Sequence, residues 1–188
     1  GGAALVRGHH GVAAGELVVQ LHEAQHPGLH RRDLERGRRG LQVAPVDIAR
    51  FDAIYELRSA LEPLAAALAA KRATPEQIAR GRALVEHGRV TASAGDSTAA
   101  LEADVAFHEW IYQVSGNPLI VRSMEANWQH LRRAMGEVLR HPALASVVWD
   151  EHAEILEAIA AGDSERADRM IKAHVTTAHA RVGLLLHT

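Results

Sequence analysis

Apolar residues recur at helical spacing from about residue 47 to the end of the chain. In the stretch 47–72, the residues Ile54, Leu57, Leu61, Leu64 and Leu68 are spaced three and four apart, which predicts a helix with one buried stripe. Five more helices are predicted over about 74–92, 97–114, 117–140, 144–161 and 164–185. Because the breaks between them are short, the pattern predicts an all-α antiparallel bundle of six or seven helices.

The breaks carry recognisable start and stop signals. Thr74 can cap a helix, Pro75 suits the first helical position, and Gln77 can close a capping box. Gly116 and Gly162 stand where a helix can end in the left-handed conformation. The proline at His141-Pro142 predicts another break. These signals support separate helices rather than one long coil.

Residues 1–46 follow a different pattern from residues 47–188. The first stretch is rich in Gly, His and Arg, and only 17–19 and 41–43 look like short strands. Five arginines lie between positions 31 and 39, at Arg31, Arg32, Arg36, Arg38 and Arg39. Such a run is either a solvated arginine loop or a contact for DNA phosphates. The sequence therefore predicts two regions, 1–46 and 47–188.

Composition narrows the classes of function. Hydrophobic residues make up 47% and charged residues 23% of the 188 residues, as in ordinary globular proteins. No run of about 18 apolar residues predicts a membrane span, and no secretory signal is recognisable, so we expect a cytoplasmic protein. The net charge of −2 argues against a protein that coats nucleic acid. Since the chain has no cysteine, any metal must be held by His, Asp or Glu.

Four residues on three predicted helices could form a metal site. Asp104 and His108 are four apart on one helix and so point to the same side. His152 and His174 lie on the last two helices. Imidazole and carboxylate ligands suit Zn, Ni, Mn or Fe(II) and leave positions open for a ligand. The alternative is incidental histidines, because the chain has 13 of them and an Asp-x-x-x-His pair is common by chance.

Three segments resemble successive signatures of one family. They are "DAIYELRSALEPLAAALAAKRAT" (52–74), "EADVAFHEWIYQVSGNPLI" (102–120) and "WDEHAEILEAIAAGDSERADRMIKAHV" (149–175). Together they are similar to the C-terminal ligand-binding (FCD) domain of the FadR branch of GntR regulators. In metal-binding members, an Asp-x-x-x-His pair and two later histidines are the ligands, which fall on Asp104, His108, His152 and His174. The resemblance thus implies a divalent transition metal, with zinc or nickel preferred and manganese possible in principle. The acyl-CoA-binding member lacks this ligand set, so a fatty acyl effector is not expected.

The resemblance also implies a small carboxylate effector. Arg58 stands among apolar residues, and a buried guanidinium needs an anionic partner. In the family this arginine pairs with the carboxylate of the effector; the alternative is a salt bridge to Glu62, four residues on. Asn127 and Arg132 are further candidates for the pocket, although a solvent-facing position would also explain them.

The N-terminal region departs from the family pattern. The segment 37–46 resembles the end of a DNA-binding wing, and 15–19 resembles part of a preceding strand, but the two helices that read DNA are not found. We therefore interpret 1–46 as an incomplete or atypical wing and linker, a remnant of a winged helix-turn-helix. Arg36, Arg38 and Arg39 are its candidate DNA contacts. Specific operator binding by this chain alone is predicted to be weak or absent.

Taken with the resemblance, the residues predict a bacterial transcriptional regulator rather than an enzyme. In such a protein, metal and effector binding in the bundle would control DNA binding by a homodimer, with Trp110 or Trp128 as candidates for its interface. A metal-dependent hydrolase is the first alternative, but Glu102 and Glu109 fall off the ligand face and leave no placed general base. A structural helical module without a metal is the second.

Overall fold

A computed structural model describes residues 34–37, 40–43 and 48–186 of the chain. Its elements are β1 (Leu34–Gly37), β2 (Gly40–Val43), α2 (Ile48–Arg72), α3 (Pro75–Ser93), α4 (Ser97–Val114), α5 (Pro118–Leu139), α6 (Pro142–Ala160) and α7 (Ser164–Leu186). The expected all-α bundle is confirmed, and each predicted helix lies within a few residues of its observed bounds. Within this described part, no helix has the length and apolar character needed to cross a membrane.

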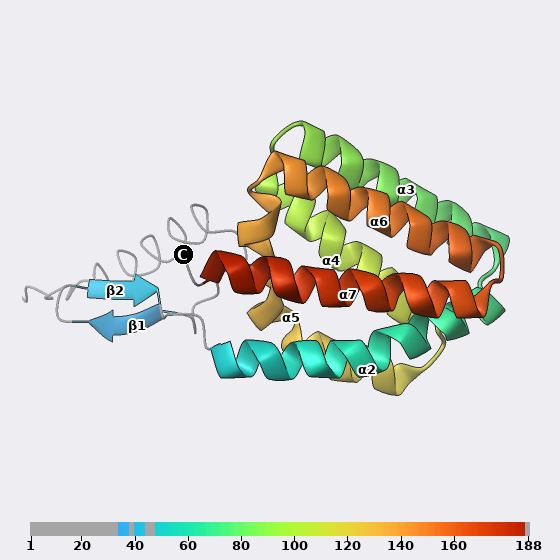
Figure 1. The fold of residues 1–188 in the computed structure, drawn as a ribbon, viewed down its shortest axis with the longest axis horizontal. Helices are drawn as coiled ribbons and strands as arrows, with labels where there is room; N and C mark the ends of the chain where they lie inside the picture. Colours follow the sequence, from blue (N-terminus) through green and yellow to red (C-terminus); the bar gives the residue numbers. More distant parts are fainter. Residues whose placement is uncertain (1–33, 38–39, 44–47, 187–188) are drawn as a thin grey trace, which may run out of the picture.

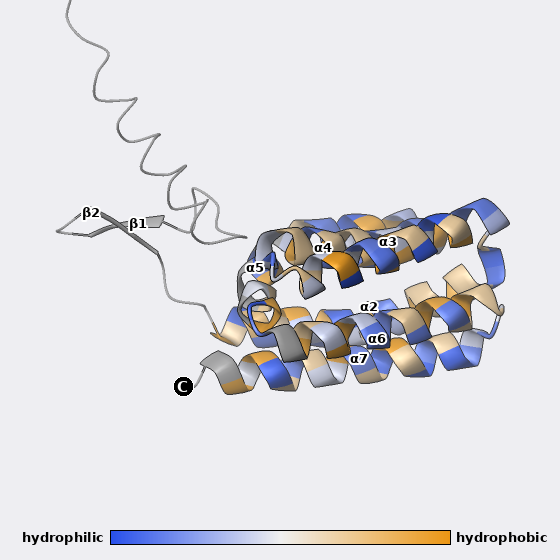
Figure 2. Cartoon of the chain, turned by 90° about the horizontal axis from the view of Figure 1, so that it is seen from above, coloured by the Kyte–Doolittle hydropathy of each residue, from blue (hydrophilic) through white to orange (hydrophobic). Residues whose placement is uncertain are grey.

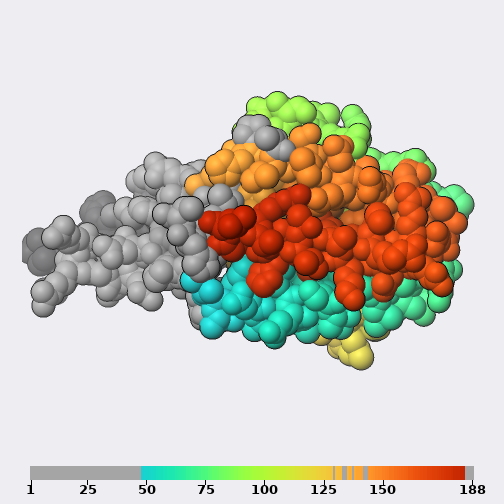
Figure 3. Space-filling view, in the orientation of Figure 1, coloured from blue at the N-terminus to red at the C-terminus, as the bar shows by residue number. Residues whose placement is uncertain are grey.

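The helices pack side by side with their axes roughly aligned (Figure 1). The most extensive contact joins α2 to α7, which run in opposite directions, and α3 packs on both α4 and α6. Seen from above, α6 and α7 lie in one layer and α3 and α4 in the other (Figure 2). On the face drawn in Figure 3, α7 lies between α2 and α6 and covers the interior. Residues on α4, α6 and α7 can therefore meet inside the bundle.

The predicted start and stop signals operate as expected. Thr74 and Gln77 form the capping box, with the backbone N–H of Thr74 donating to Gln77 Oε1 at 2.9 Å and that of Gln77 donating to Thr74 Oγ1 at 3.3 Å. Gly116 and Gly162 adopt positive φ angles of 64° and 70°, which glycine tolerates without strain. Helix α6 begins at Pro142 rather than at 144, because proline fits the first turn of a helix instead of excluding it.

The predicted stripe on α2 is wrong in part. Leu64 is 47% exposed, and Leu57 and Leu61 are only half-buried. The buried face of α2 is instead formed by Phe51, Ile54, Tyr55, Arg58, Glu62, Pro63, Ala65, Ala66, Ala69 and Ala70. Alanines let the neighbouring helices approach closely, and the buried charged pair occupies positions that a purely apolar pattern would assign to solvent.

Both tryptophans suggested for a dimer interface belong to the core. Trp110 is 3% exposed and Trp128 is 4% exposed within the single chain. Neither side chain therefore offers a surface to a second copy, and this expectation is corrected. The phenylalanines, tyrosines and tryptophans of the chain are all buried in this core.

Before the bundle, β1 and β2 form an antiparallel hairpin in which Leu34 pairs with Val43 and Gly37 with Gly40. The strand expected at 41–43 is thus part of β2. Arg36 lies on β1, opposite Leu41. Arg38 and Arg39, the arginines at 31 and 32 and the segment 17–19 lie outside the described residues. The division into 1–46 and 47–188 stays a prediction.

Candidate metal centre

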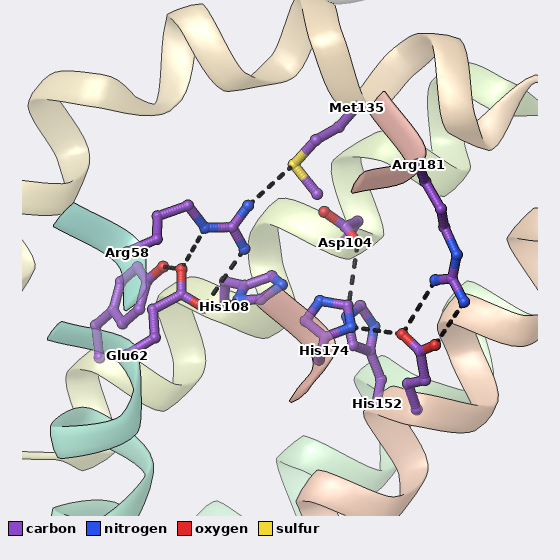
Figure 4. Close-up of polar contacts among 10 residues, drawn as sticks. Arg58, Glu62, Asp104, His108, Met135, His152, His174 and Arg181 are labelled. Atoms are coloured by element: carbon purple, nitrogen blue, oxygen red, sulfur yellow. Dashed lines mark hydrogen bonds and ion pairs between the residues drawn. The ribbon is translucent and has the colours of Figure 1, made fainter. Parts of the chain in front are cut away.

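The four predicted ligands converge in the interior of the bundle (Figure 4). Asp104 and His108 come from α4, one turn apart, while His152 comes from α6 and His174 from α7. All four side chains are buried, with at most 2% of any residue exposed. The packing of α4, α6 and α7 is therefore what joins positions 70 residues apart in the sequence.

The three histidines are close enough for one ion. One nitrogen from each ring can be chosen so that all three lie within 4.8 Å of one another. Bonds from nitrogen to zinc are about 2.1 Å, so two ligands of one ion lie at most about 4.2 Å apart. The ring nitrogens therefore need to move less than about 1 Å closer together to bind one ion. Asp104 adds a carboxylate at the edge of this group, with its Oδ1 3.7 Å from His152 Nε2.

Most of the potential metal-binding atoms at this point lack a hydrogen-bond partner in the described structure. Both carboxylate oxygens of Asp104, both ring nitrogens of His108 and His152, and Nε2 of His174 are buried without a hydrogen-bond partner there. Each such group costs about 1–3 kcal/mol when it is left unsatisfied. A divalent cation would satisfy several of them at once, so the residues present fit a metal.

Burial sets the protonation of these groups. Burial lowers the pKa of His108 to about 4, against a smaller opposing effect of the nearby Glu62 carboxylate. Burial, with the neighbouring His174 and His108, also holds the pKa of His152 well below its ordinary value. Both rings are consequently neutral near pH 7, which is the form that binds metal. Burial raises the pKa of Asp104 to about 7, and a bound cation would favour its anionic form.

Arg58 is fully buried and already has an anionic partner. Its Nε donates to Glu62 Oε1 at 2.7 Å and its Nη2 to Glu62 Oε2 at 3.4 Å. Its Nη1 donates to the sulfur of Met135, at 3.9 Å. The salt bridge that sequence reasoning weighed as an alternative is therefore present, and Nη1 keeps donor capacity toward the interior.

Three more polar residues complete the centre, and sequence reasoning did not assign them to it. Glu62 accepts a hydrogen bond from Tyr112 Oη at 2.7 Å and lies 3.3 Å from His108 Nδ1. Glu151 Oε2 lies 2.8 Å from His174 Nδ1, and Arg181 Nη2 donates to Glu151 Oε1 at 2.7 Å. The sequence offered a signal for two of them: Glu151 directly precedes the candidate ligand His152, and Arg181 follows His174 by two helical turns.

The other predicted effector residues are engaged elsewhere. Asn127 donates to the carbonyl of Ser123 on its own helix at 2.8 Å. Arg132 pairs with Glu102 of α4. The small cavity beside the histidines is not lined by either of them. Their roles in binding an effector stay predictions.

That cavity has a volume of about 20 Å³. Its polar lining comes from Tyr55, Asp104, His174 and Arg181, and the rest is apolar: Met135, Val138, Leu139, Val148, Ala178 and Val182. A water molecule needs about 10–15 Å³ of such space. The cavity therefore holds little more than a water in this conformation.

Comparison with known families identifies the bundle. The family model of the FCD domain matches residues 53–177, which include all four candidate ligands. The chain belongs to the FCD domain family. The resemblance on which the site residues were chosen is thereby confirmed.

Relatives with this domain are named as transcriptional regulators. A putative L-lactate dehydrogenase operon regulatory protein of Escherichia coli K12 is 31% identical over 136 residues, covering 69% of this chain and 50% of that protein. The transcriptional repressor NanR of Klebsiella aerogenes is 32% identical over 142 residues, covering 73% and 52%. The chain thus spans about half the length of these relatives. Both are named as regulators of transcription or of an operon, the class of protein expected for this chain.

Solved structures show the same fold. McbR/YncC of Escherichia coli matches with a TM-score of 0.71 and 21% identity, over 88% of this chain and 81% of that one. A GntR protein of Streptococcus agalactiae matches with a TM-score of 0.58 and 21% identity, over 95% and 90%. At this identity the likeness concerns the fold alone.

Proposed function

We propose that residues 47–188 are the effector-sensing domain of a transcriptional regulator and that they bind a divalent transition metal through Asp104, His108, His152 and His174. The observation that carries this proposal is the buried convergence of three imidazoles and one carboxylate whose donor atoms lack other partners. Zinc and nickel suit the nitrogen-rich set best, and manganese is a third candidate.

A small carboxylate is the proposed effector. A six-coordinate ion such as nickel or manganese keeps two positions open when four protein ligands hold it, and Arg58 Nη1 offers a second cationic contact nearby. One relative is named for an L-lactate dehydrogenase operon, which makes L-lactate the first carboxylate to test. Effector binding would favour one arrangement of the helices and so change how a winged helix-turn-helix meets operator DNA.

The metal can be tested on the protein purified without chelators or nickel columns. Elemental analysis is expected to find metal in the parent protein, or to find uptake of added zinc, nickel or manganese. His108→Ala and His174→Ala are expected to abolish it, while His87→Ala, at an exposed position on α3, retains it. A parent protein that neither contains nor takes up any of these metals would refute the proposal.

Partners other than the metal need separate tests. Sedimentation of the purified chain would test the homodimer that the resemblance implies. A gel shift would test the proposed contact of Arg36, Arg38 and Arg39 with DNA. Tight, sequence-selective binding by this chain alone would contradict the expectation drawn from residues 1–46.

A further inference from the structure

Two of the three histidines have a glutamate carboxylate beside Nδ1 of the ring. Glu151 Oε2 lies 2.8 Å from His174 Nδ1, and Glu62 Oε2 lies 3.3 Å from His108 Nδ1. Each carboxylate in turn accepts hydrogen bonds from an arginine, Glu151 from Arg181 and Glu62 from Arg58 (Figure 4). The same order of groups, arginine to glutamate to histidine, thus occurs twice around one centre.

We propose that Glu151 and Glu62 are positioning residues of the metal centre, which fix His174 and His108 in the tautomer that carries its proton on Nδ1 and presents Nε2 to the ion. This inference rests on the proposed metal site and adds residues to it. An ionised carboxylate can only accept a hydrogen bond, so the nitrogen that faces it must carry the proton. The remaining nitrogen then has its lone pair free for a metal.

The arginines keep the carboxylates ionised in the interior. A neighbouring guanidinium favours the anionic form of a carboxylate, and Glu62 lies 2.7 Å from Arg58 Nε. Arg181 contacts both oxygens of Glu151, at 2.7 and 3.2 Å, which also fixes the plane of the carboxylate.

His152 provides an internal contrast. No contact of its ring nitrogens with a glutamate is found among the described residues, whereas His108 Nδ1, which likewise makes no full hydrogen bond, lies 3.3 Å from Glu62. Packing fixes its orientation instead: its ring stacks on that of Phe107, with the ring centroids 4.4 Å apart, and forms a T-shaped pair with Trp149, with the centroids 4.8 Å apart. The proposal therefore assigns a fixed tautomer to His174 and His108 and none to His152.

The direct test is proton–nitrogen NMR of the full chain labelled in its histidines, first without metal and then with added zinc alone. We expect His174 and His108 to carry the proton on Nδ1 before zinc is added, and zinc to shift their Nε2 signals. Glu151→Gln should release the fixed tautomer of His174 but not that of His108. It should also weaken zinc binding about 10- to 100-fold, as loss of such a carboxylate does elsewhere.

Glu154→Gln is the matched control, because Glu154 is exposed one turn further along α6. It should leave both the tautomers and the zinc affinity unchanged. Arg181→Lys keeps the charge but loses the two-point contact, so its zinc affinity should lie between those of the parent and Glu151→Gln. Thermal unfolding of each metal-free variant separates weaker zinc binding from loss of the fold.

The outcomes distinguish this inference from the proposed function. A proton on Nε2 of His174 in the metal-free parent, or unchanged zinc affinity in Glu151→Gln, would overturn the role of Glu151. A proton on Nε2 of His108 would overturn that of Glu62. If the parent has the expected tautomers but binds no zinc, the metal site fails while the hydrogen-bond arrangement stands.

Discussion

A single buried ion pair on α2 shows how this chain uses charged residues in its core. Arg58 and Glu62 are both 0% exposed, and their contact at 2.7 Å lies among apolar side chains and the hydroxyl of Tyr112. A buried pair contributes little net stability over apolar residues of the same size, but either partner alone is an uncompensated charge. The pair is consequently sensitive to single substitutions.

We expect Glu62→Gln to destabilise the protein by about 3–5 kcal/mol, because it leaves the Arg58 guanidinium buried without an anion. The double change Arg58→Met and Glu62→Leu should restore most of that loss. Urea unfolding of the metal-free proteins measures both values. Glu56→Gln, an exposed change on the same helix, serves as control and should stay within about 0.5 kcal/mol of the parent. A double variant as unstable as the single one would contradict this account.

The two tyrosines of the chain allow the loss of folding stability at high pH to be measured. Tyr55 and Tyr112 are each 1% exposed. Burial raises the pKa of Tyr55 to about 12, opposed in part by Arg58, and burial followed by Glu62 raises the pKa of Tyr112 well above its ordinary value. The folded state thus favours neutral tyrosine, so this stability is fully present below pH 10 and is lost as the pH rises toward 12.

For Tyr55 the loss should reach about 3 kcal/mol near pH 12. We therefore expect tyrosinate absorbance to appear together with the loss of helical circular dichroism. Tyr55→Phe should move this transition to higher pH without lowering stability at pH 7, because the Tyr55 hydroxyl has no partner among the described residues. Tyrosinate signal from a fully helical protein would be inconsistent with both pKa shifts.

How far the centre could be predicted differs from residue to residue. His108 and Asp104 follow from a spacing of four on one helix, and His152 and His174 needed the family resemblance to be chosen from 13 histidines. The spacing of seven residues places Arg181 on the same face of α7 as His174, but its contact with Glu151 could not be predicted, because it depends on the rotation of α7 against α6. Local patterns do not encode that rotation.

At the scale of helices, bounds were predictable and faces were not. Proline, glycine and capping residues act within one turn, so Thr74 and Gly116 could be placed from the sequence. The buried face of α2 depends instead on which neighbours pack on it, and alanine gives a weak hydropathy signal. Leu64 is exposed for this reason, although its spacing predicted burial.

Close packing of α3 against α4 and α6 depends on two glycines. A Cβ at Gly88 would lie 2.1 Å from ring atoms of Trp149, and one at Gly81 would lie 2.6 Å from the ring of Trp110. Trp149 is 0% exposed and meets the edge of His152, so it cannot yield without disturbing a candidate ligand. The spacing of these helices is thus linked to the centre.

We expect Gly88→Ala to destabilise the protein by at least about 1–3 kcal/mol, since overpacking outweighs the higher helix propensity of alanine. It should also weaken zinc binding. Gly183→Ala is the matched control on α7, where a Cβ would meet no described atom within 4 Å, and it should be neutral or stabilise by up to about 1 kcal/mol. Thermal unfolding and zinc titration compare the stability and zinc affinity of both variants. Equal changes in the two variants would show that the contact with Trp149 does not cause the effect of Gly88→Ala.

At the scale of the whole bundle, the small volume of this cavity limits how the proposed effector can bind. A space of about 20 Å³ is too small for any carboxylate larger than a few atoms, and its walls come from five helices. An effector such as L-lactate must therefore bind a conformation in which these helices stand further apart. It shifts the equilibrium toward that conformation by its difference in affinity for the two states.

If the metal forms part of the effector site, binding of the two must be reciprocal. Any factor by which zinc strengthens L-lactate binding is the factor by which L-lactate strengthens zinc binding. We expect this factor to be about 5–150, corresponding to 1–3 kcal/mol of coupling. Calorimetry of L-lactate with and without zinc, and zinc titration with and without L-lactate, give the two factors independently.

His87→Ala should keep the coupling, whereas His108→Ala should remove the dependence on zinc. L-lactate that binds equally well to the metal-free parent would show that the ion is structural and that Arg58 or another group alone holds the carboxylate. If L-lactate does not bind but another small carboxylate binds more tightly in the presence of zinc, only the proposed identity of the effector changes. The reciprocal measurement therefore separates a metal that binds the ligand from a metal that only stabilises the bundle.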